Sequence, residues 1–69
     1  MKYEWARALK EQRKAMGITQ MELTEATNIP QSSISAWENG TNAPSIENCL
    51  QLADFYGISL DELVGRSMK

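Results

Sequence analysis

Residues that end helices recur along the whole chain at short intervals. Glycine or asparagine follows each of five stretches with helical periodicity, at Gly17, Asn28, Gly40, Gly57 and Gly65. Both residue types tolerate the left-handed backbone conformation with which many helices end. No segment alternates between apolar and polar residues with a period of two, so no strand is expected. The sequence therefore predicts an all-α fold built from about five short helices.

Three of the expected helices also carry start signals. Thr19 with Glu22, and Ser59 with Glu62, fit the S/T-x-x-E capping box, in which each side chain satisfies a backbone N–H of the other residue. Ser45 follows a proline and is a good N-cap for a helix in the fourth stretch. These signals place helix starts at or just after residues 19, 45 and 59.

Size and composition restrict the function classes. Sixty-nine residues form one small domain, expected to span 1–69 with a tail at 65–69, and a chain this short gains stability by forming a dimer. There is no histidine and one cysteine, Cys49. The most common general base of enzymes and the usual sets of zinc ligands are therefore missing. We expect no enzyme activity, no metal, no cofactor and no small-molecule ligand. No membrane span or signal peptide is apparent, so a cytoplasmic protein is expected.

Charge is distributed unevenly along the chain, whose formal net charge is −2. Residues 1–14 carry five basic and two acidic side chains, whereas residues 15–65 carry seven acidic side chains and no lysine or arginine. Nucleic-acid-binding domains commonly present a basic patch. Any attraction of formal charges to phosphate must therefore come from the ends of the chain.

The first helix has two different faces. Trp5, Leu9 and Met16 fall on one face, which predicts that they contact the core, and Arg13 lies at the edge of this apolar stripe. An arginine in that position needs an anionic partner.

The opposite face of the first helix carries the one compact basic stripe of the chain, formed by Arg7, Lys10 and Lys14. Such a stripe is either a solvated helix face or a contact to phosphate, and the pattern alone favours neither.

The second and third helices are joined by a very short connection. The second helix is expected from Thr19 to about Thr27, with Met21, Leu23 and Ala26 directed toward other helices. Three residues, 28–30, separate it from the third helix, as in a helix-turn-helix. We therefore predict a helix-turn-helix over about residues 19–39.

The third helix, about residues 31–39, points Ile34 and Trp37 inward. Its outer face carries small and amide-bearing residues, namely Gln31, Ser32, Ser35, Ala36 and Asn39. Glutamine and asparagine can pair with an adenine edge, serine can donate or accept, and alanine can contact a thymine methyl. The alternative is a polar surface helix with no partner. Glu38 lies at the inner edge of this helix, so an ion pair between Arg13 and Glu38 is predicted.

Many of these residues follow a known order and spacing. They are Arg13, Gly17, Ile18, Thr19, Gln20, Leu23, Ile34, Ser35, Trp37, Glu38, Gly40, Pro44, Leu52, Ala53, Gly57, Ile58 and Leu63. The pattern resembles the helix-turn-helix family of phage repressor and Cro proteins, also called the xenobiotic-response-element (XRE) family. The resemblance spans about residues 5–64 and implies a compact five-helix, lambda-repressor-like DNA-binding domain.

The resemblance also implies roles for individual residues. In such proteins the third helix enters the major groove, and dimers address two half-sites about one helical turn apart. The positions similar to base-reading residues are Gln31, Ser32 and Ala36, with Ser35 beside them. The positions similar to residues that contact the phosphate backbone are Gln20, Asn39, Thr41 and Asn42, to which the basic stripe adds Lys10 and Lys14. Arg13 and Glu38 match the interhelical salt bridge of the family.

The sequence departs from the family pattern at three places. Thr24 replaces the usual alanine, Asn28 replaces the usual glycine of the turn, and the segment after Gly40, often basic in the family, reads TNAP. Asparagine is the best non-glycine residue for positive φ, so the turn is expected to form. The expected function is a sequence-specific, double-stranded-DNA-binding transcriptional regulator, a repressor acting as a homodimer. The alternative is a protein-interaction module of the same fold with little DNA affinity.

Overall fold

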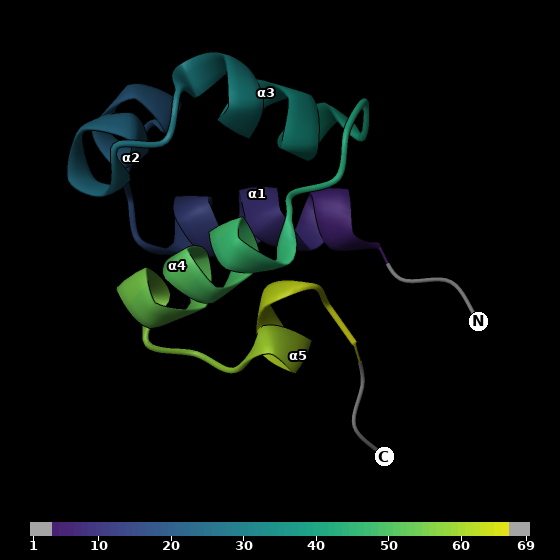
Figure 1. Ribbon diagram of the computed structural model, residues 1–69. Coiled ribbons are helices and arrows are strands. Elements are labelled where there is room, and N and C mark those ends of the chain that lie inside the picture. Colours follow the sequence, from purple (N-terminus) through teal and green to yellow (C-terminus); the bar gives the residue numbers. More distant parts are fainter. Residues whose placement is uncertain (1–3, 67–69) are drawn as a thin grey trace.

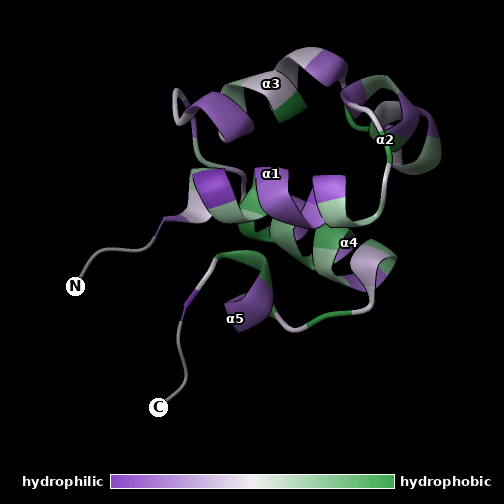
Figure 2. Ribbon diagram, turned by 180° about the vertical axis from the view of Figure 1, so that it is seen from behind, coloured by the Kyte–Doolittle hydropathy of each residue, from purple (hydrophilic) through white to green (hydrophobic). Residues whose placement is uncertain are grey.

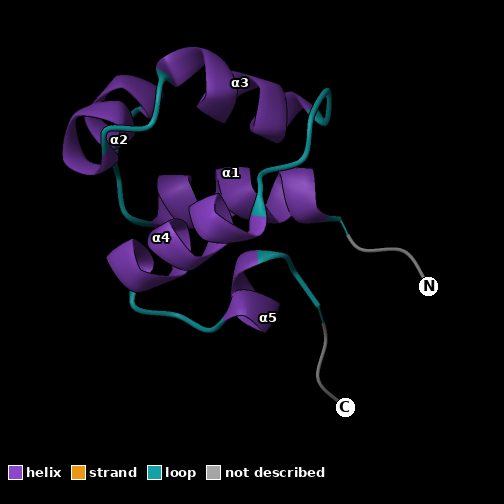
Figure 3. Ribbon diagram, in the orientation of Figure 1, coloured by secondary structure: helices purple, strands orange, loops and turns teal. Residues whose placement is uncertain are grey.

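The computed structural model describes residues 4–66, which form five α-helices joined by short loops (Figure 1). Helix and loop account for all of the described chain (Figure 3). The helices are α1 (Trp5–Ala15), α2 (Gln20–Thr27), α3 (Gln31–Asn39), α4 (Ile46–Tyr56) and α5 (Leu60–Leu63). The predicted all-α, five-helix fold is confirmed. Of the expected tail at 65–69, residues 67–69 lie outside the described part.

The helix ends form where the local signals predict them. Thr19 and Ser59 each make both hydrogen bonds of a capping box, and Ser45 caps α4 by accepting from the backbone N–H of Asn48. Asn28 has φ = 65°, and Gly40 has φ = 78°, so both adopt the left-handed conformation at a helix C-terminus. Short-range hydrogen bonds and backbone preferences therefore set the helix boundaries.

The core lies between α1, the helix-turn-helix, α4 and α5. Its buried apolar residues are Leu9, Leu23, Ile29, Ile34, Trp37, Leu52, Ala53 and Leu63. In Figure 2 the ribbon of α3 is mostly hydrophilic or neutral with one hydrophobic stretch, whereas hydrophobic stretches prevail along α4. Each helix buries one narrow apolar face, as expected for helices that cover a small core.

The helices lie in layers around α1. The α2 and α3 helices lie on one side of α1, α5 lies on the other side, and both α3 and α5 contact α1 (Figure 1). The α3 helix is therefore at the surface opposite α5. None of the described helices is long and apolar enough to cross a membrane.

Three expected core residues are exposed instead. Met16 lies one residue beyond the end of α1 and is 50% exposed, because the chain turns away from the helix axis at Gly17. Met21 is 51% exposed, and Ala26 is exposed as well. The α2 helix turns Leu23 and Thr27 toward the core, which places Met21 and Ala26 on its outer side.

Candidate nucleic-acid interface

The turn between α2 and α3 is fixed by contacts on both sides. Asn28 supplies the left-handed backbone, and Ile29 is buried with 4% exposure. The Thr27 hydroxyl donates to the Leu23 carbonyl over 2.7 Å and accepts from the Ile29 N–H over 3.3 Å. The side-chain amide of Gln51, on α4, donates to the Thr27 carbonyl over 2.6 Å. The helix-turn-helix is therefore attached to α4 by a hydrogen bond as well as by apolar packing.

The α3 helix presents its polar side to solvent. Ile34 and Trp37 are buried, with 2% and 6% exposure. On the other side, Gln31 and Ser32 are exposed, and Ser35 and Ala36 are half-buried. The four residues that we predicted to read bases thus lie along one helix whose opposite face is fixed in the core.

The first turn of α3 has no side-chain cap. Its N-cap is Pro30, which makes no capping hydrogen bond, whereas Thr19 caps α2 and Ser45 caps α4. The first N–H groups of a helix have no acceptor within the helix. Within residues 4–66, the first backbone N–H groups of α3 therefore receive no capping hydrogen bond from a side chain.

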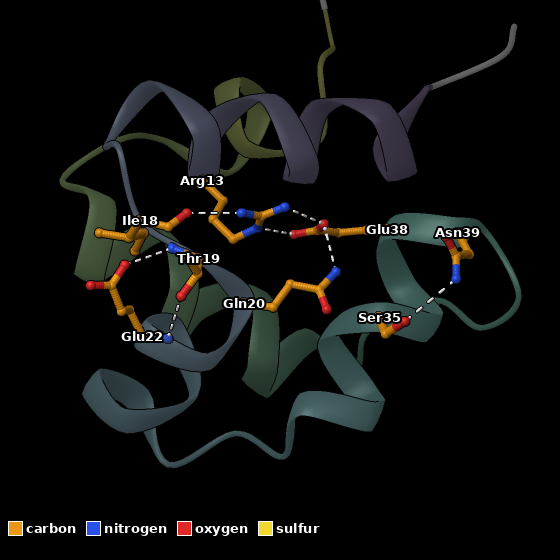
Figure 4. Close-up of polar contacts among 8 residues, drawn as sticks. All are labelled: Arg13, Ile18, Thr19, Gln20, Glu22, Ser35, Glu38 and Asn39. Atoms are coloured by element: carbon orange, nitrogen blue, oxygen red, sulfur yellow. Dashed lines mark hydrogen bonds and ion pairs between the residues drawn. The ribbon is translucent and has the colours of Figure 1, made fainter.

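The predicted ion pair between Arg13 and Glu38 is present. Arg13 Nε donates to Glu38 Oε2 over 2.7 Å, and Arg13 Nη2 donates to Glu38 Oε1 over 2.9 Å (Figure 4). Arg13 Nη1 also donates to the Ile18 carbonyl over 2.8 Å. The side chains of Arg13 and Glu38 are 10% and 4% exposed. This two-point contact fixes α3 to α1 with a defined orientation.

The surroundings of Glu38 keep it ionised. Burial opposes the charged form, but the hydrogen bonds from Arg13 and Gln20 and the charges of Arg13 and Lys10 outweigh burial and lower the pKa of Glu38. Burial of the nearby Tyr56 hydroxyl, together with the Glu38 charge, raises the pKa of Tyr56 to about 12. Glu38 therefore acts at neutral pH as a buried acceptor of hydrogen bonds.

Gln20 lies beside this ion pair. Its side-chain nitrogen donates to Glu38 Oε1 over 3.1 Å, so α2 joins the contact between α1 and α3 (Figure 4). Gln20 was predicted only as a phosphate-contacting residue. The bond to Glu38 could not be foreseen, because it depends on how α2 and α3 are placed relative to each other.

The other neutral residues expected to contact phosphate lie at the C-terminal end of α3. Asn39, Thr41 and Asn42 are exposed, and Asn39 Nδ2 also donates to Ser35 Oγ over 3.4 Å. The backbone N–H groups of Thr41 and Asn42 donate to the Ala36 carbonyl, which ties the segment after α3 to the last turn of that helix.

Within residues 4–66, Arg7 is the one member of the basic stripe of α1 that forms ion pairs. Arg7 donates to Glu11 over 3.1 Å and to Glu4 over 3.5 Å, and all three side chains are largely exposed. Lys10 and Lys14 are exposed, and neither forms an ion pair within residues 4–66. The two lysines therefore retain uncompensated charge. Glu4 and Glu11 lie three and four positions from Arg7, a sequence signal for pairing on a helix, whereas Lys10 has no acidic residue at either spacing.

Comparison with known proteins identifies the family. A family model described as Helix-turn-helix matches residues 9–63. The chain is 40% identical over 58 residues to the cryptic phage CTXphi transcriptional repressor RstR of Vibrio cholerae, covering 84% of this chain and 52% of that protein. It is 36% identical over 58 residues to the HTH-type transcriptional regulator ImmR of Bacillus subtilis, covering 84% of this chain and 46% of ImmR.

Two further similarities extend the comparison. The chain is 30% identical over 61 residues to the HTH-type transcriptional activator BcrR of Enterococcus faecalis, covering 88% of this chain and 30% of BcrR. The crystal structure of a transcriptional regulator from Listeria innocua superposes with a TM-score of 0.86 at 26% identity, covering 100% of this chain and 64% of that one. The chain spans about half the length of RstR and ImmR. The residues matched by the family model include α2, the turn and α3. The chain therefore belongs to the Cro/C1-type helix-turn-helix family.

Proposed function

We propose that this chain binds double-stranded DNA as the reading domain of a transcriptional regulator, with α3 in the major groove. The observation that carries this proposal is the outer face of α3. It offers Gln31, Ser32, Ser35 and Ala36 while Ile34 and Trp37 anchor the helix from behind. Neutral groups of this kind read base edges by hydrogen bonds and methyl contacts. The similarity to RstR, which is named a repressor, favours repression.

Phosphate recognition in this proposal relies on few charges. Lys10 and Lys14 supply the cations, and Gln20, Asn39, Thr41 and Asn42 supply neutral donors. The uncapped first turn of α3 adds backbone N–H groups, which bind anions at a helix N-terminus. Affinity for any single half-site is therefore modest, and the regulator acts as a homodimer on two half-sites about one helical turn apart.

The reading role of Gln31 gives the direct test. Duplexes bound by the chain are selected from a randomised pool at low salt, and binding is then measured by fluorescence anisotropy. We expect Gln31→Ala to lower the preference for selected over random duplexes by roughly tenfold, because one bidentate base contact contributes about 1–3 kcal/mol of discrimination. Gln31 is exposed, so the variant keeps the unfolding midpoint of the wild type. Equal binding of the wild type to selected and random duplexes would refute sequence-specific reading.

A protein-interaction module of the same fold is the second candidate. It is favoured by the absence of lysine and arginine from residues 15–65 and by the exposed Ile46, Leu50 and Leu60, of which Ile46 is 77% exposed. These apolar residues also suit a dimer contact. Sedimentation of the wild type and of an Ile46→Ser/Leu50→Ser variant tests whether the α4 surface carries self-association. The two candidates differ in their affinity for DNA. Sequence-specific binding to a duplex, even by a protein that sediments as a monomer, would exclude the interaction module with little DNA affinity.

A further inference from the structure

Gln20 completes a chain of polar contacts that joins three helices. Arg13 of α1 holds both oxygens of Glu38 of α3, over 2.7 and 2.9 Å, and Gln20 of α2 donates to the same Oε1 over 3.1 Å (Figure 4). The Glu38 side chain is 4% exposed, so water does not compete strongly for it. The carboxylate that Gln20 contacts is thus fixed in the free protein.

The chemistry of Glu38 decides how the amide of Gln20 is turned. An ionised carboxylate accepts hydrogen bonds and donates none. The amide must therefore direct its nitrogen to Glu38, and Figure 4 shows its oxygen on the side away from that carboxylate. One N–H of the amide remains for an outside acceptor. With an apolar residue at position 38, this contact would no longer select one orientation of the amide.

We propose that Glu38 is a positioning residue for DNA binding, which holds the Gln20 amide in one orientation with an N–H free to donate to a DNA phosphate. This inference rests on the proposed DNA-binding function. Immobilising one glutamine side chain before binding is worth about two- to tenfold in affinity. Such a gain is significant for a chain without lysine or arginine in residues 15–65.

A double-mutant cycle on DNA affinity tests the inference. Gln20→Met is made in the wild type and in an Arg13→Met/Glu38→Leu background, where the buried pair is replaced by apolar side chains without leaving an unpaired charge. We expect Gln20→Met to weaken binding about tenfold in the wild type and about twofold in the double variant.

Asn42→Ala is the matched control. Asn42 is an exposed candidate phosphate contact without a side-chain hydrogen bond to Glu38. The Asn42→Ala substitution should therefore weaken DNA binding by the same factor in both backgrounds. A purely structural effect of the background would alter both Gln20→Met and Asn42→Ala, whereas the positioning role alters Gln20→Met alone.

The wild type provides a second readout if the double variant does not fold. In the NMR spectrum of the free protein, one side-chain amide proton of Gln20 should already be shifted downfield by Glu38. On addition of a selected duplex that proton should keep its shift, and the other proton should move downfield. If neither proton moves, or if Gln20→Met costs the same in both backgrounds while the wild type binds, the positioning role is wrong. If the wild type binds no duplex, the proposed function is wrong and the inference with it.

Discussion

At the scale of single residues, Thr24 is an unusual feature of the interior. Its hydroxyl oxygen is the one buried side-chain polar atom of residues 4–66 without a hydrogen-bond partner. Three residues further on, Thr27 is also buried, but its hydroxyl both donates to Leu23 and accepts from Ile29. A buried, unsatisfied hydroxyl costs about 1–3 kcal/mol. Position 24 is also where the sequence departs from the alanine that is usual in the family.

The two threonines make a matched pair of variants. We expect Thr24→Val to raise the free energy of unfolding by about 1 kcal/mol, because it removes an unsatisfied hydroxyl and keeps the side-chain shape. Thr27→Val should lower it by a similar amount, because the Ile29 N–H then loses its acceptor. Urea denaturation of the two variants and the wild type measures both effects. Destabilisation of similar size in both would show that the Thr24 hydroxyl has a partner.

The lowered pKa of Glu38 predicts how stability depends on pH. The folded state binds the proton more weakly than the unfolded state, whose pKa is about 4.3. The stabilisation is therefore fully present above pH 4.3 and is lost as the pH falls through the folded-state pKa. Burial favours the protonated form of Glu38, and the positive charges of Arg13 and Lys10 favour the ionised form. The half-buried Tyr56 also lies near this carboxylate.

The Arg13→Met/Glu38→Leu variant isolates this contribution because it lacks the carboxylate. The difference in unfolding free energy between the wild type and this variant should stay constant from pH 7 to about 5 and shift in favour of the variant below about pH 4.3. Urea denaturation at several pH values between 7 and 3 measures it. A difference that does not change over this range would mean that Glu38 keeps an ordinary pKa in the folded protein.

At the scale of elements, the connection of α2 to α3 depends on one asparagine. Asn28 has φ = 65° and ψ = 14°, a conformation that glycine adopts without strain and that other residues adopt at a cost of about 1–2 kcal/mol. Asparagine tolerates it better than most residues. The turn is held further by the Gln51 hydrogen bond from α4. The angle between the two helices therefore depends on a local backbone preference and a tertiary contact.

Substitution of Asn28 tests the backbone contribution. Asn28→Gly should leave stability unchanged or raise it by up to about 1 kcal/mol, and Asn28→Ala should lower it by about 1 kcal/mol. Glu25→Gly provides the control, since Glu25 is exposed in the middle of α2 and glycine there should destabilise by about 0.5–1 kcal/mol. Thermal denaturation followed by circular dichroism compares the four proteins. Equal losses for Asn28→Gly and Glu25→Gly would contradict the role assigned to the turn.

At the scale of the whole molecule, most of the described basic side chains are already paired with carboxylates. Among the described basic residues, Arg13 is committed to Glu38, Arg7 to Glu4 and Glu11, and Arg66 contacts Asp61 over 3.5 Å. Lys10 and Lys14 remain without an ion pair within residues 4–66. If the chain binds DNA as proposed, its phosphate contacts therefore rest more on neutral donors than on cations.

This arrangement predicts a weak dependence of DNA binding on salt. With two lysines in contact with phosphate, log K should fall with log[salt] with a slope of about −2 per protomer. Lys10→Gln and Lys14→Gln should each reduce that slope by about 1, and Arg7→Gln should leave it unchanged because its charge is already paired. Anisotropy titrations from 50 to about 200 mM salt provide the slopes. A slope steeper than about −4, or an equal effect of Arg7→Gln, would show that other cations contact the DNA.

The local parts of this fold could be predicted from the sequence. The capping boxes at Thr19 and Ser59 and the left-handed residues Asn28 and Gly40 set the helix boundaries through contacts within a few residues. The pairing of Arg13 with Glu38 could also be deduced, because each lay beside an apolar face and a buried charge needs a partner.

The tertiary structure alone decided how α2 is rotated about its axis. Periodicity gives the angles between residues of one helix, but a helix of two turns such as α2 has few apolar residues to indicate which face is inward. Packing against α3 and α4 selected the face with Leu23 and Thr27, left Met21 in solvent and enclosed the Thr24 hydroxyl. The same rotation brought Gln20 to Glu38, a contact between residues 18 positions apart that no local signal encodes.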